Sequence, residues 1–296
     1  MTARRMRVGV VGTGHWARVV HAAGAAAHPD VDLVAVWGRD RAKAEAIAAD
    51  HAAVGLDDLD EMLDAVDILT VAVPPHVQAE VALRAAQAGT HLLLEKPIST
   101  DLAAADRLVA AVDRSGVSTV VFFTQRFVPV WERWLAGFEA GAVLGGRAEW
   151  LGARFEPDSP YAGSVWRREE GALWDVGPHA LSQLLPVLGP VVDVAGVRGH
   201  GDLVHLALRH AGGATSTLAL SLTMPAAAAR VGVELYDERG WHTRPEEERD
   251  VAAAYATALS ELVANAAAGV PHHRCDVRFG REVVEVLSRC RAALVP

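Results

Sequence analysis

The chain has 296 residues, of which 51% are hydrophobic and 22% charged, so it can bury sizeable cores and is unlike a disordered or collagen-like chain. Its length fits two domains better than one. The formal net charge of −9 argues against a nucleic-acid partner, because this balance would not neutralise a phosphate backbone. The two cysteines, Cys275 and Cys290, form no CxxC pair, so we expect inert thiols, no disulfide scaffold and no metal site.

Targeting and membrane segments are not indicated. The N-terminal arginines resemble the start of a signal peptide, but the apolar run at residues 8–11 ends at Gly12 and is too short for its apolar core. No uninterrupted apolar stretch approaches the ~20 residues of a membrane span. We therefore expect a soluble cytoplasmic protein with a small-molecule substrate and no membrane partner.

In about the first 120 residues, short β-branched runs alternate with longer alanine-rich runs of helical period, which is typical of a parallel sheet covered by helices. The expected strands are residues 7–11, 33–37, 68–73, 91–94 and 118–123. The expected helices are residues 16–27, 41–51, 59–63, 77–88 and 102–115. The pattern predicts an α/β fold, with a doubly wound Rossmann domain at residues 1–124.

After about residue 128 an amphipathic helix, expected at 130–140, is followed by strands without intervening helices. These strands are expected at residues 147–155, 193–198, 203–209, 214–221 and 231–236. Consecutive strands favour a largely antiparallel open sheet, so we predict an α+β domain at residues 125–296. Two helices, at 251–268 and 277–294, end the chain, and the last could pack back on the first domain.

The first expected strand is followed directly by a G-x-G-x-x-A turn made of Gly12, Thr13, Gly14, His15, Trp16 and Ala17. Glycines are needed there because the turn is tight and its backbone approaches a pyrophosphate, whose charge lies at the helix N-terminus. Such turns also occur without a ligand. The strand before it and the helix after it favour dinucleotide binding.

The end of the second strand indicates which dinucleotide is bound. In NAD-binding units an acidic residue there binds the ribose 2′-hydroxyl, whereas here Gly38 occupies the position and Arg39 follows it. A guanidinium pairs bidentately with phosphate, so these residues favour NADP, with NAD as the alternative. In that alternative Arg39 is a solvated loop residue and Asp40 reaches the ribose.

A buried run at residues 92–94 ends abruptly in Glu95, Lys96 and Pro97. A charged pair at the carboxyl end of a parallel strand points into the crevice where α/β sheets bind ligands. Lysine there can donate a hydrogen bond to a reacting oxygen and stabilise developing negative charge. The alternative is a salt-bridged loop without a catalytic role.

Asp175 and His179 are four residues apart, so on one helix they would face the same space. Pro178 suits the first turn of that helix, and Gly189 ends it. Imidazole titrates near neutrality and can carry the proton when a carbonyl becomes an alcohol. A helix-capping aspartate with an incidental histidine would give the same spacing.

Three stretches, in order, resemble the glucose-fructose oxidoreductase, inositol dehydrogenase and MocA family. The first runs from Val73, Pro74, Pro75 and His76 to Glu95-Lys96-Pro97. The second is Trp166-Arg167 followed by residues 171–179, and the third is the pair of C-terminal helices. The resemblance covers essentially the whole chain.

By this resemblance Lys96 is the catalytic lysine, touching both the nicotinamide ribose and the substrate, and Pro97 is expected to be cis. Asp175 and His179 would bind substrate and transfer the proton. Further substrate-binding candidates are Arg126, Trp166 and Arg167. The cofactor-binding candidates are Gly12, Thr13, Gly14, His15, Trp16, Gly38, Arg39, Val73, Pro74, His76, Glu95, Lys96 and Pro97.

The sequence departs from the family at Ser182, where many members have a second aspartate, and at Trp174, where a small aliphatic residue is usual. These departures weaken any inference about a sugar substrate. The leading hypothesis is an NAD(P)-dependent oxidoreductase acting on a carbonyl or secondary alcohol of a sugar-like or cyclic molecule. The alternatives are an imine reductase and a non-catalytic NADP(H)-binding sensor. Family members often pair through their second-domain sheets, so we expect a homo-oligomer, a dimer or tetramer.

Overall fold

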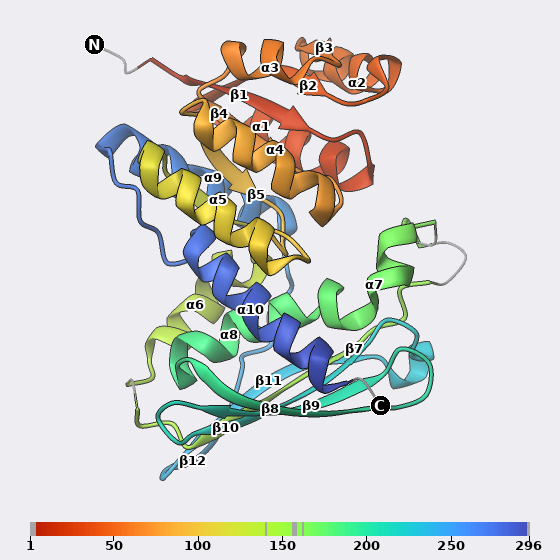
Figure 1. Cartoon of the computed structure of the whole chain (residues 1–296), viewed down its shortest axis with the longest axis vertical. Coiled ribbons are helices and arrows are strands. Elements are labelled where there is room, and N and C mark those ends of the chain that lie inside the picture. The colour runs from red at the N-terminus through yellow and green to blue at the C-terminus, as the bar shows by residue number, and fades with distance from the viewer. Residues whose placement is uncertain (1–3, 140, 156–158, 162, 295–296) are drawn as a thin grey trace. The chain divides into compact units, whose positions relative to one another are not determined.

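The computed structural model describes residues 4–139, 141–155, 159–161 and 163–294. The chain forms two compact units. The first comprises Met1–Phe127 and Asp250–Arg281, and the second comprises Val128–Arg249 and Glu282–Pro296 (Figure 1).

The first unit is built on a six-stranded sheet of order β3-β2-β1-β4-β5-β6, in which every pair is parallel. Its strands are β1 Met6–Val11, β2 Val31–Trp37, β3 Val54–Leu56, β4 Ile68–Val71, β5 His91–Leu94 and β6 Thr119–Val121. The strand order reverses beside β1, where β2 and β4 flank it. A doubly wound sheet binds ligands at such a switch point, so the predicted Rossmann fold is confirmed.

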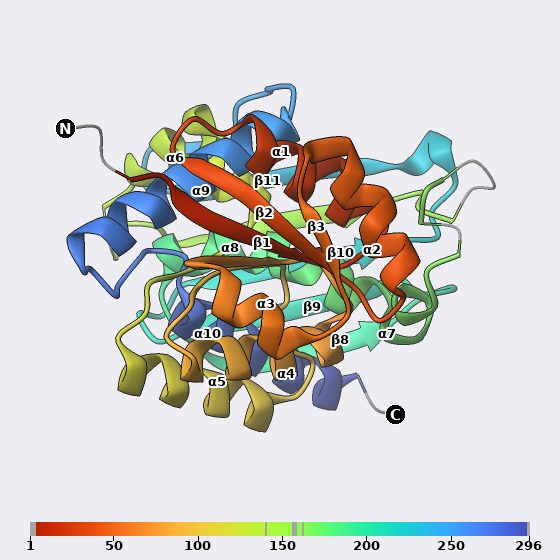
Figure 2. The same cartoon turned by 90° about the horizontal axis from the view of Figure 1, so that it is seen from above.

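Helices cover both faces of this sheet. Figure 2 shows α3, α4 and α5 on one face and α1, α2 and α9 on the other. Their bounds are η1 Ala17–Ala22, α1 Ala23–Ala27, α2 Arg41–Ala48, η2 Ala49–His51, α3 Leu59–Ala65, α4 Pro75–Gln87, α5 Leu102–Ser115, η3 Thr124–Phe127 and α9 Val251–Ala268. Asp40, Asp58 and Asp101 begin α2, α3 and α5, and each side chain accepts a backbone N–H of the first turn.

The second unit is built on a six-stranded sheet of order β12-β11-β7-β10-β9-β8. Its strands are β7 Gly145–Leu151, β8 Val191–Arg198, β9 Val204–His210, β10 Thr215–Ser221, β11 Arg230–Asp237 and β12 Gly240–Thr243. The pairing of β10 with β7 is parallel and the others are antiparallel, which confirms the largely antiparallel sheet. The remaining elements are α6 Pro129–Ala136, α7 Val165–Asp175, α8 Gly177–Leu188 and η4 Ala226–Ala228. Helix α10, Val277–Ala293, begins in the first unit and continues into the second at Glu282.

The structure corrects the expected domain boundaries. Residues 250–281, expected in the second domain, belong to the first unit, and its N-terminal part ends at Phe127 rather than at residue 124. The reason is the packing of α9. Tyr255 of this helix is fully buried, donates to the Thr70 hydroxyl of β4 at 3.1 Å, and lies so close to Gly24 that a Cβ there would clash with its ring.

Helix α9 is also long and apolar enough, by length and composition, to cross a membrane. It packs instead as a core helix of the first unit, burying Ala254, Tyr255, Ala258, Leu259 and Leu262. The expected soluble, cytoplasmic location stays a prediction.

Candidate active site

The glycine turn after β1 combines one glycine required by the fold with one that leaves open space. Gly12 has φ +126°, donates to the Trp37 carbonyl at 2.9 Å, and a Cβ there would lie 2.5 Å from the carbonyl oxygen of Ala72. A Cβ on Gly14 would meet no atom of the chain within 4 Å. The turn thus leaves its backbone accessible at the start of a helix, as a pyrophosphate requires.

The helix after this turn contains a π-helical segment, η1, that carries a buried histidine. His21 Nδ1 lies 2.6 Å from the Thr70 hydroxyl of β4, and Nε2 lies 3.1 Å from Oε1 of Glu95. Tyr255 donates to the same Thr70 oxygen. The Thr70 hydroxyl can therefore donate its own proton to Nδ1 of His21, and the Nε2–H of His21 donates to the Glu95 carboxylate. Burial raises the pKa of Tyr255, which therefore remains the donor.

Glu95 joins the glycine turn to Lys96. The indole N–H of Trp16 donates to Oε1 of Glu95, and the backbone N–H of Lys96 lies 3.3 Å from Oε2. Gln78 of α4 donates to the carbonyls of Glu95 and Pro97 at 2.6 and 3.0 Å, and its Oε1 accepts from the Glu95 N–H at 2.9 Å. The backbone around Lys96 is therefore held on both sides. The Lys96–Pro97 bond is cis, as expected.

At the end of β2, Gly38 has a packing role of its own, because a Cβ there would lie 2.5 Å from Cγ2 of Thr13. Asp40 caps α2 by accepting from the Lys43 N–H at 3.3 Å, and its carboxylate also lies 3.3 Å from Nζ of Lys43. These hydrogen bonds lower the pKa of Asp40. The carboxylate is thus occupied at its own helix, while the neighbouring Arg39 is exposed.

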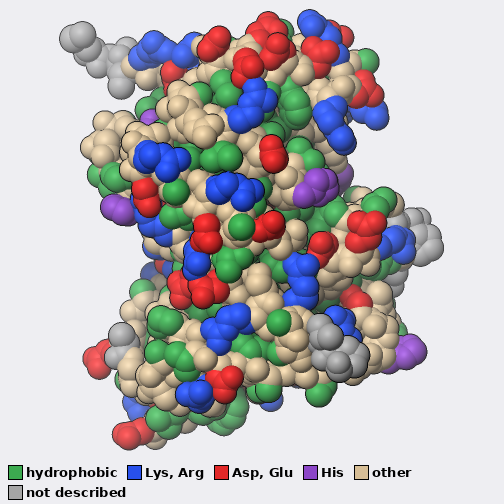
Figure 3. Space-filling view, in the orientation of Figure 1, with side chains coloured by type: hydrophobic (Ala, Val, Ile, Leu, Met, Phe, Trp, Pro, Cys, Tyr) green, Lys and Arg blue, Asp and Glu red, His purple; other side chains and the backbone are tan. Residues whose placement is uncertain are grey.

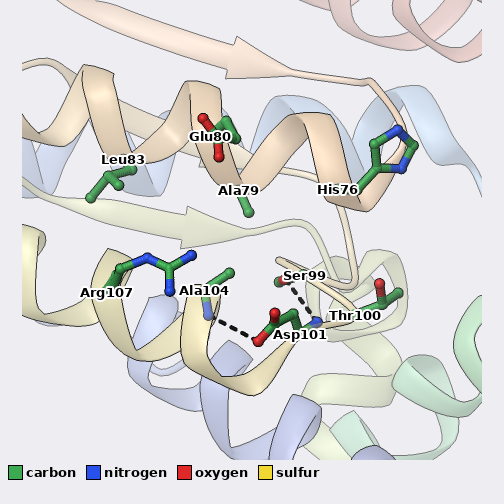
Figure 4. A pocket seen from close by; sticks show the side chains of 9 residues that line it. All are labelled: His76, Ala79, Glu80, Leu83, Ser99, Thr100, Asp101, Ala104 and Arg107. Carbon is green, nitrogen blue, oxygen red and sulfur yellow. Dashed lines mark hydrogen bonds between the residues drawn. The ribbon is translucent and has the colours of Figure 1, made fainter.

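The loop after β4 leads into α4, with Pro74 as its N-cap and Pro75 in its first turn. His76 is exposed and lines a hollow of about 180 Å³ between the N-terminal ends of α4 and α5, with Glu80, Asp101 and Arg107 around it (Figure 4). Val73, Pro74 and His76 are thus next to one another before and within this first turn, as the sequence predicts; their contact with a cofactor stays a prediction.

In the second unit Asp175 and His179 lie on two helices, which corrects the expected single helix. Asp175 is the last residue of α7, His179 lies in the first turn of α8, and Val176 between the helices has φ −110° and ψ −19°. Both side chains are nevertheless buried, with 5% and 7% of their surfaces exposed. Helix α7 itself bends at Gly171, whose φ is +67°.

Each of these two residues has a defined partner. Nε of Arg167 lies 3.2 Å from Oδ2 of Asp175, and its guanidinium lies 4.5 Å from the ring centre of Tyr161. The ring of His179 stacks on that of Trp150 from β7, with 4.8 Å between centroids and 18° between planes. The sequence predicted Arg167 but not Trp150, because only the pairing of β7 in the sheet brings that residue beneath α8.

Other candidates have different surroundings. Ser182 donates to the His179 carbonyl at 2.9 Å, so this hydroxyl binds the backbone of its own helix. Trp174 is buried, with the Arg291 guanidinium 4.4 Å from its ring centre. The guanidinium of Arg167 lies 4.6 Å from the ring centre of Trp166. Arg126 belongs to the first unit, buried in η3 with its guanidinium 6.0 Å from the Phe279 ring centre.

Both parts of the chain match models of one protein family. Residues 6–123 match the oxidoreductase family with NAD-binding Rossmann fold, and residues 132–243 match the GFO/IDH/MocA C-terminal domain. An uncharacterized oxidoreductase of Synechocystis is 30% identical over 199 residues, which are 64% of this chain and 53% of that relative. The match thus spans about half of the relative's length.

Two further relatives cover more of the chain. UDP-N-acetylglucosamine 3-dehydrogenase of Acidithiobacillus ferrooxidans is 29% identical over 235 residues, 77% of this chain and 71% of that enzyme. Its crystal structure superposes with a TM-score of 0.83 over 98% of both chains, at 24% identity.

The structure of GenD2 from gentamicin A biosynthesis, in complex with NAD, gives a TM-score of 0.84 at 25% identity, over 99% of this chain and 95% of that one. Because both units match models of one family, the chain belongs to the glucose-fructose oxidoreductase, inositol dehydrogenase and MocA family and is an oxidoreductase with a nicotinamide-binding Rossmann domain.

Proposed function

We propose that the chain is an NADP-dependent oxidoreductase that transfers a hydride between nicotinamide and a carbonyl or secondary alcohol of a sugar-like or cyclic molecule. The observation that carries this proposal is the shared carboxylate of Glu95. It binds Trp16 of the glycine turn and the backbone N–H of Lys96. The turn suited to the pyrophosphate and the candidate catalytic lysine are thereby fixed to each other within one unit.

The choice of NADP rests on the end of β2. Asp40 is occupied as the cap of α2 and as the partner of Lys43, so it is poorly placed to bind a ribose hydroxyl. Arg39 is exposed and has no ion pair within the part of the chain that the structure describes. A guanidinium in that setting suits a 2′-phosphate.

The proposed roles follow from the residues' chemistry. Bound nicotinamide supplies or accepts the hydride. The Lys96 ammonium donates a hydrogen bond to the reacting substrate oxygen and stabilises its developing negative charge. His179 gives or takes the proton at Nε2, because its Nδ1 is buried. Arg167 orients Asp175 by an ion pair, so that this carboxylate can bind a substrate hydroxyl.

Lysine is rare in this chain, since Lys43 and Lys96 are its two lysines and arginine carries the remaining basic charge. Only lysine combines a compact ammonium with a proton that it can lose, whereas arginine stays charged. A matched pair of variants is therefore available. Lys96→Met removes the proposed catalytic ammonium, and Lys43→Met removes the other, which is 70% exposed on α2.

The test is a turnover screen of ketosugars, sugars, ketones and cyclic imines with NADPH, NADH and their oxidised forms. We expect turnover of a sugar-like substrate, a preference for NADPH, and a loss of about 100-fold or more in Lys96→Met but not in Lys43→Met. Turnover of cyclic imines alone would identify an imine reductase. Cofactor binding without any turnover would identify a sensor, and a clear preference for NADH would refute the role of Arg39.

The expected homo-oligomer remains a proposal. One face of the second sheet carries small or apolar side chains of β8, β9 and β10, including Ala195, Ala207, Ala219 and Val197, the last 64% exposed, next to the charged Arg147 and Glu149 of β7. We propose that a second copy of the chain covers this face. Sedimentation velocity should show a dimer or tetramer that Val197→Lys weakens. A monomer at micromolar concentration would contradict it.

A further inference from the structure

Three arginines of the second unit lie near one another. Arg154 follows β7, Arg244 follows β12, and Arg249 ends the segment before α9. Each of the three side chains is half-buried, and none forms an ion pair within residues 4–139, 141–155, 159–161 and 163–294. Elsewhere basic and acidic side chains are interleaved, as Figure 3 shows for one face of the molecule.

The positive charges of these arginines act on one another in two pairs. Burial and the positive charge of Arg249 lower the pKa of Arg244 to about 10. Burial and the positive charge of Arg154 lower the pKa of Arg249. Arg249 thus repels both Arg244 and Arg154, and such repulsion between partly buried cations destabilises the free protein. An anion bound among them would relieve that cost.

Two of the three guanidinium groups are held in place by neutral groups. Arg244 donates to Oε1 of Gln183 at 2.8 Å and lies 4.2 Å from the ring centre of Trp131. Arg154 lies 5.7 Å from the ring centre of Tyr161. Amide and aromatic partners orient a guanidinium without neutralising it, so its charge remains available to a ligand.

The same contacts connect the arginines to the proposed substrate residues. Gln183, which accepts from Arg244, donates to the His179 carbonyl at 3.1 Å. Tyr161, which lies under Arg154, also lies under Arg167, the partner of Asp175. Within this unit Arg244 and Arg154 are therefore connected to the Asp175 and His179 site through one intervening side chain or two, and Arg249 is a charged neighbour of both arginines.

We infer that Arg154, Arg244 and Arg249 bind a phosphoryl group of the substrate, so that the enzyme acts on a phosphorylated sugar. This inference rests on the proposed function for the sugar ring at His179. A carboxylate would bring a single negative charge to three guanidinium groups. A phosphate monoester or a diphosphate brings about two and offers several acceptor oxygens, which guanidinium groups bind bidentately. A sugar phosphate and a nucleoside diphosphate sugar share this chemistry.

The test measures binding by calorimetry without nicotinamide, using glucose 1-phosphate, uridine diphosphate and glucose as probes. We expect the wild-type protein to bind one or both phosphorylated probes and not glucose. Arg249→Gln should weaken that binding about tenfold or more, as the loss of a charge-assisted hydrogen bond predicts. Arg209→Gln removes an exposed arginine of β9, paired with Asp193 at 3.3 Å, and should bind as the wild type does.

Stability separates a binding role from a structural one. Removing one of three repelling cations should leave the ligand-free Tm of Arg249→Gln unchanged or higher, whereas loss of a structural arginine would lower it. Arg154→Gln provides a second variant, with the same expectation, if Arg249→Gln does not fold. Because both arginines belong to the second unit, their effect does not report the glycine turn of the first.

Each outcome decides the matter. Binding of uridine diphosphate alone would identify a nucleoside diphosphate sugar, and binding of glucose 1-phosphate a sugar phosphate. No binding of either probe by the wild type, or equal binding by Arg249→Gln and Arg154→Gln, would overturn the inference. Since no hydride transfer is measured, phosphate binding can succeed even if the proposed redox function fails.

Discussion

Replacing Gly12 and Gly14 separately with alanine should separate folding from cofactor binding. A Cβ on Gly14 meets nothing within 4 Å, so Gly14→Ala should change the free energy of unfolding by less than about 1 kcal/mol. It should nevertheless weaken NADPH binding at least about tenfold, or about 1.4 kcal/mol, because the new methyl group occupies the space where the backbone approaches the pyrophosphate.

Gly12→Ala should instead destabilise the fold. Its φ of +126° costs a residue with a side chain about 1–2 kcal/mol, and a Cβ 2.5 Å from the fixed carbonyl oxygen of Ala72 adds about 1–3 kcal/mol. The sum is about 2–5 kcal/mol. Urea denaturation measures the stability of both variants, and quenching of tryptophan fluorescence by NADPH measures binding. If Gly14→Ala bound NADPH as tightly as the wild type, the pyrophosphate would not lie at this turn.

Three further predictions concern the choice of cofactor, the positioning of Lys96 by its neighbours and the stability of the fold in acid. Arg39→Ala should weaken binding of NADPH but not of NADH. Asp40→Ala should lose about 1 kcal/mol of stability, because it removes a helix cap, and should keep the preference for NADPH. Equal effects of Arg39→Ala on the two dinucleotides would contradict the role of Arg39 at the 2′-phosphate. His21→Phe should lower kcat more than it weakens NADPH binding, because Glu95, which holds the backbone of Lys96, loses a donor 3.1 Å away. His21→Gln should restore part of the rate. An unchanged kcat in His21→Phe would exclude a role of His21 in positioning Glu95 and Lys96. Burial lowers the pKa of His210, so the unfolded chain binds the extra proton and the free energy of unfolding should fall as the pH drops from 7 through about 6.5 towards the folded pKa. Urea titrations at pH 7 and pH 5 should show a smaller loss in His210→Gln than in the wild type, and an equal loss would contradict this account.

The elements that the sequence predicted best are those with strong local signals. The bounds of β5, α5 and α9 agree with the predictions, since Asp101 and Asp250 cap the two helices and Gly116 and Gly269 end them. The short edge strands β3 and β12 were missed, because strands of three and four residues carry little periodic signal. Only pairing with a neighbouring strand defines them.

The candidate site residues that the sequence indicated belong to motifs, whereas the further residues that the structure brings to them depend on tertiary packing. Lys96, Asp175 and His179 belong to motifs. His21 reaches Glu95 across 74 residues of sequence, and it does so from a π-helical segment that no residue pattern indicated. The electrostatic setting of Arg249 was equally invisible, because Glu248 and Asp250 flank it in the sequence, whereas in the fold the positive charge of Arg154 acts on it.

The central claim is that this chain moves a hydride from nicotinamide with the help of Lys96. The most direct measurement is mass spectrometry of the product formed with NADPH that carries deuterium at the transferred position. We predict that the product of the wild-type enzyme gains one deuterium, and that Lys96→Met binds NADPH normally but forms product about 100-fold more slowly or worse. A product without deuterium, or equal rates in the two proteins, would contradict the claim.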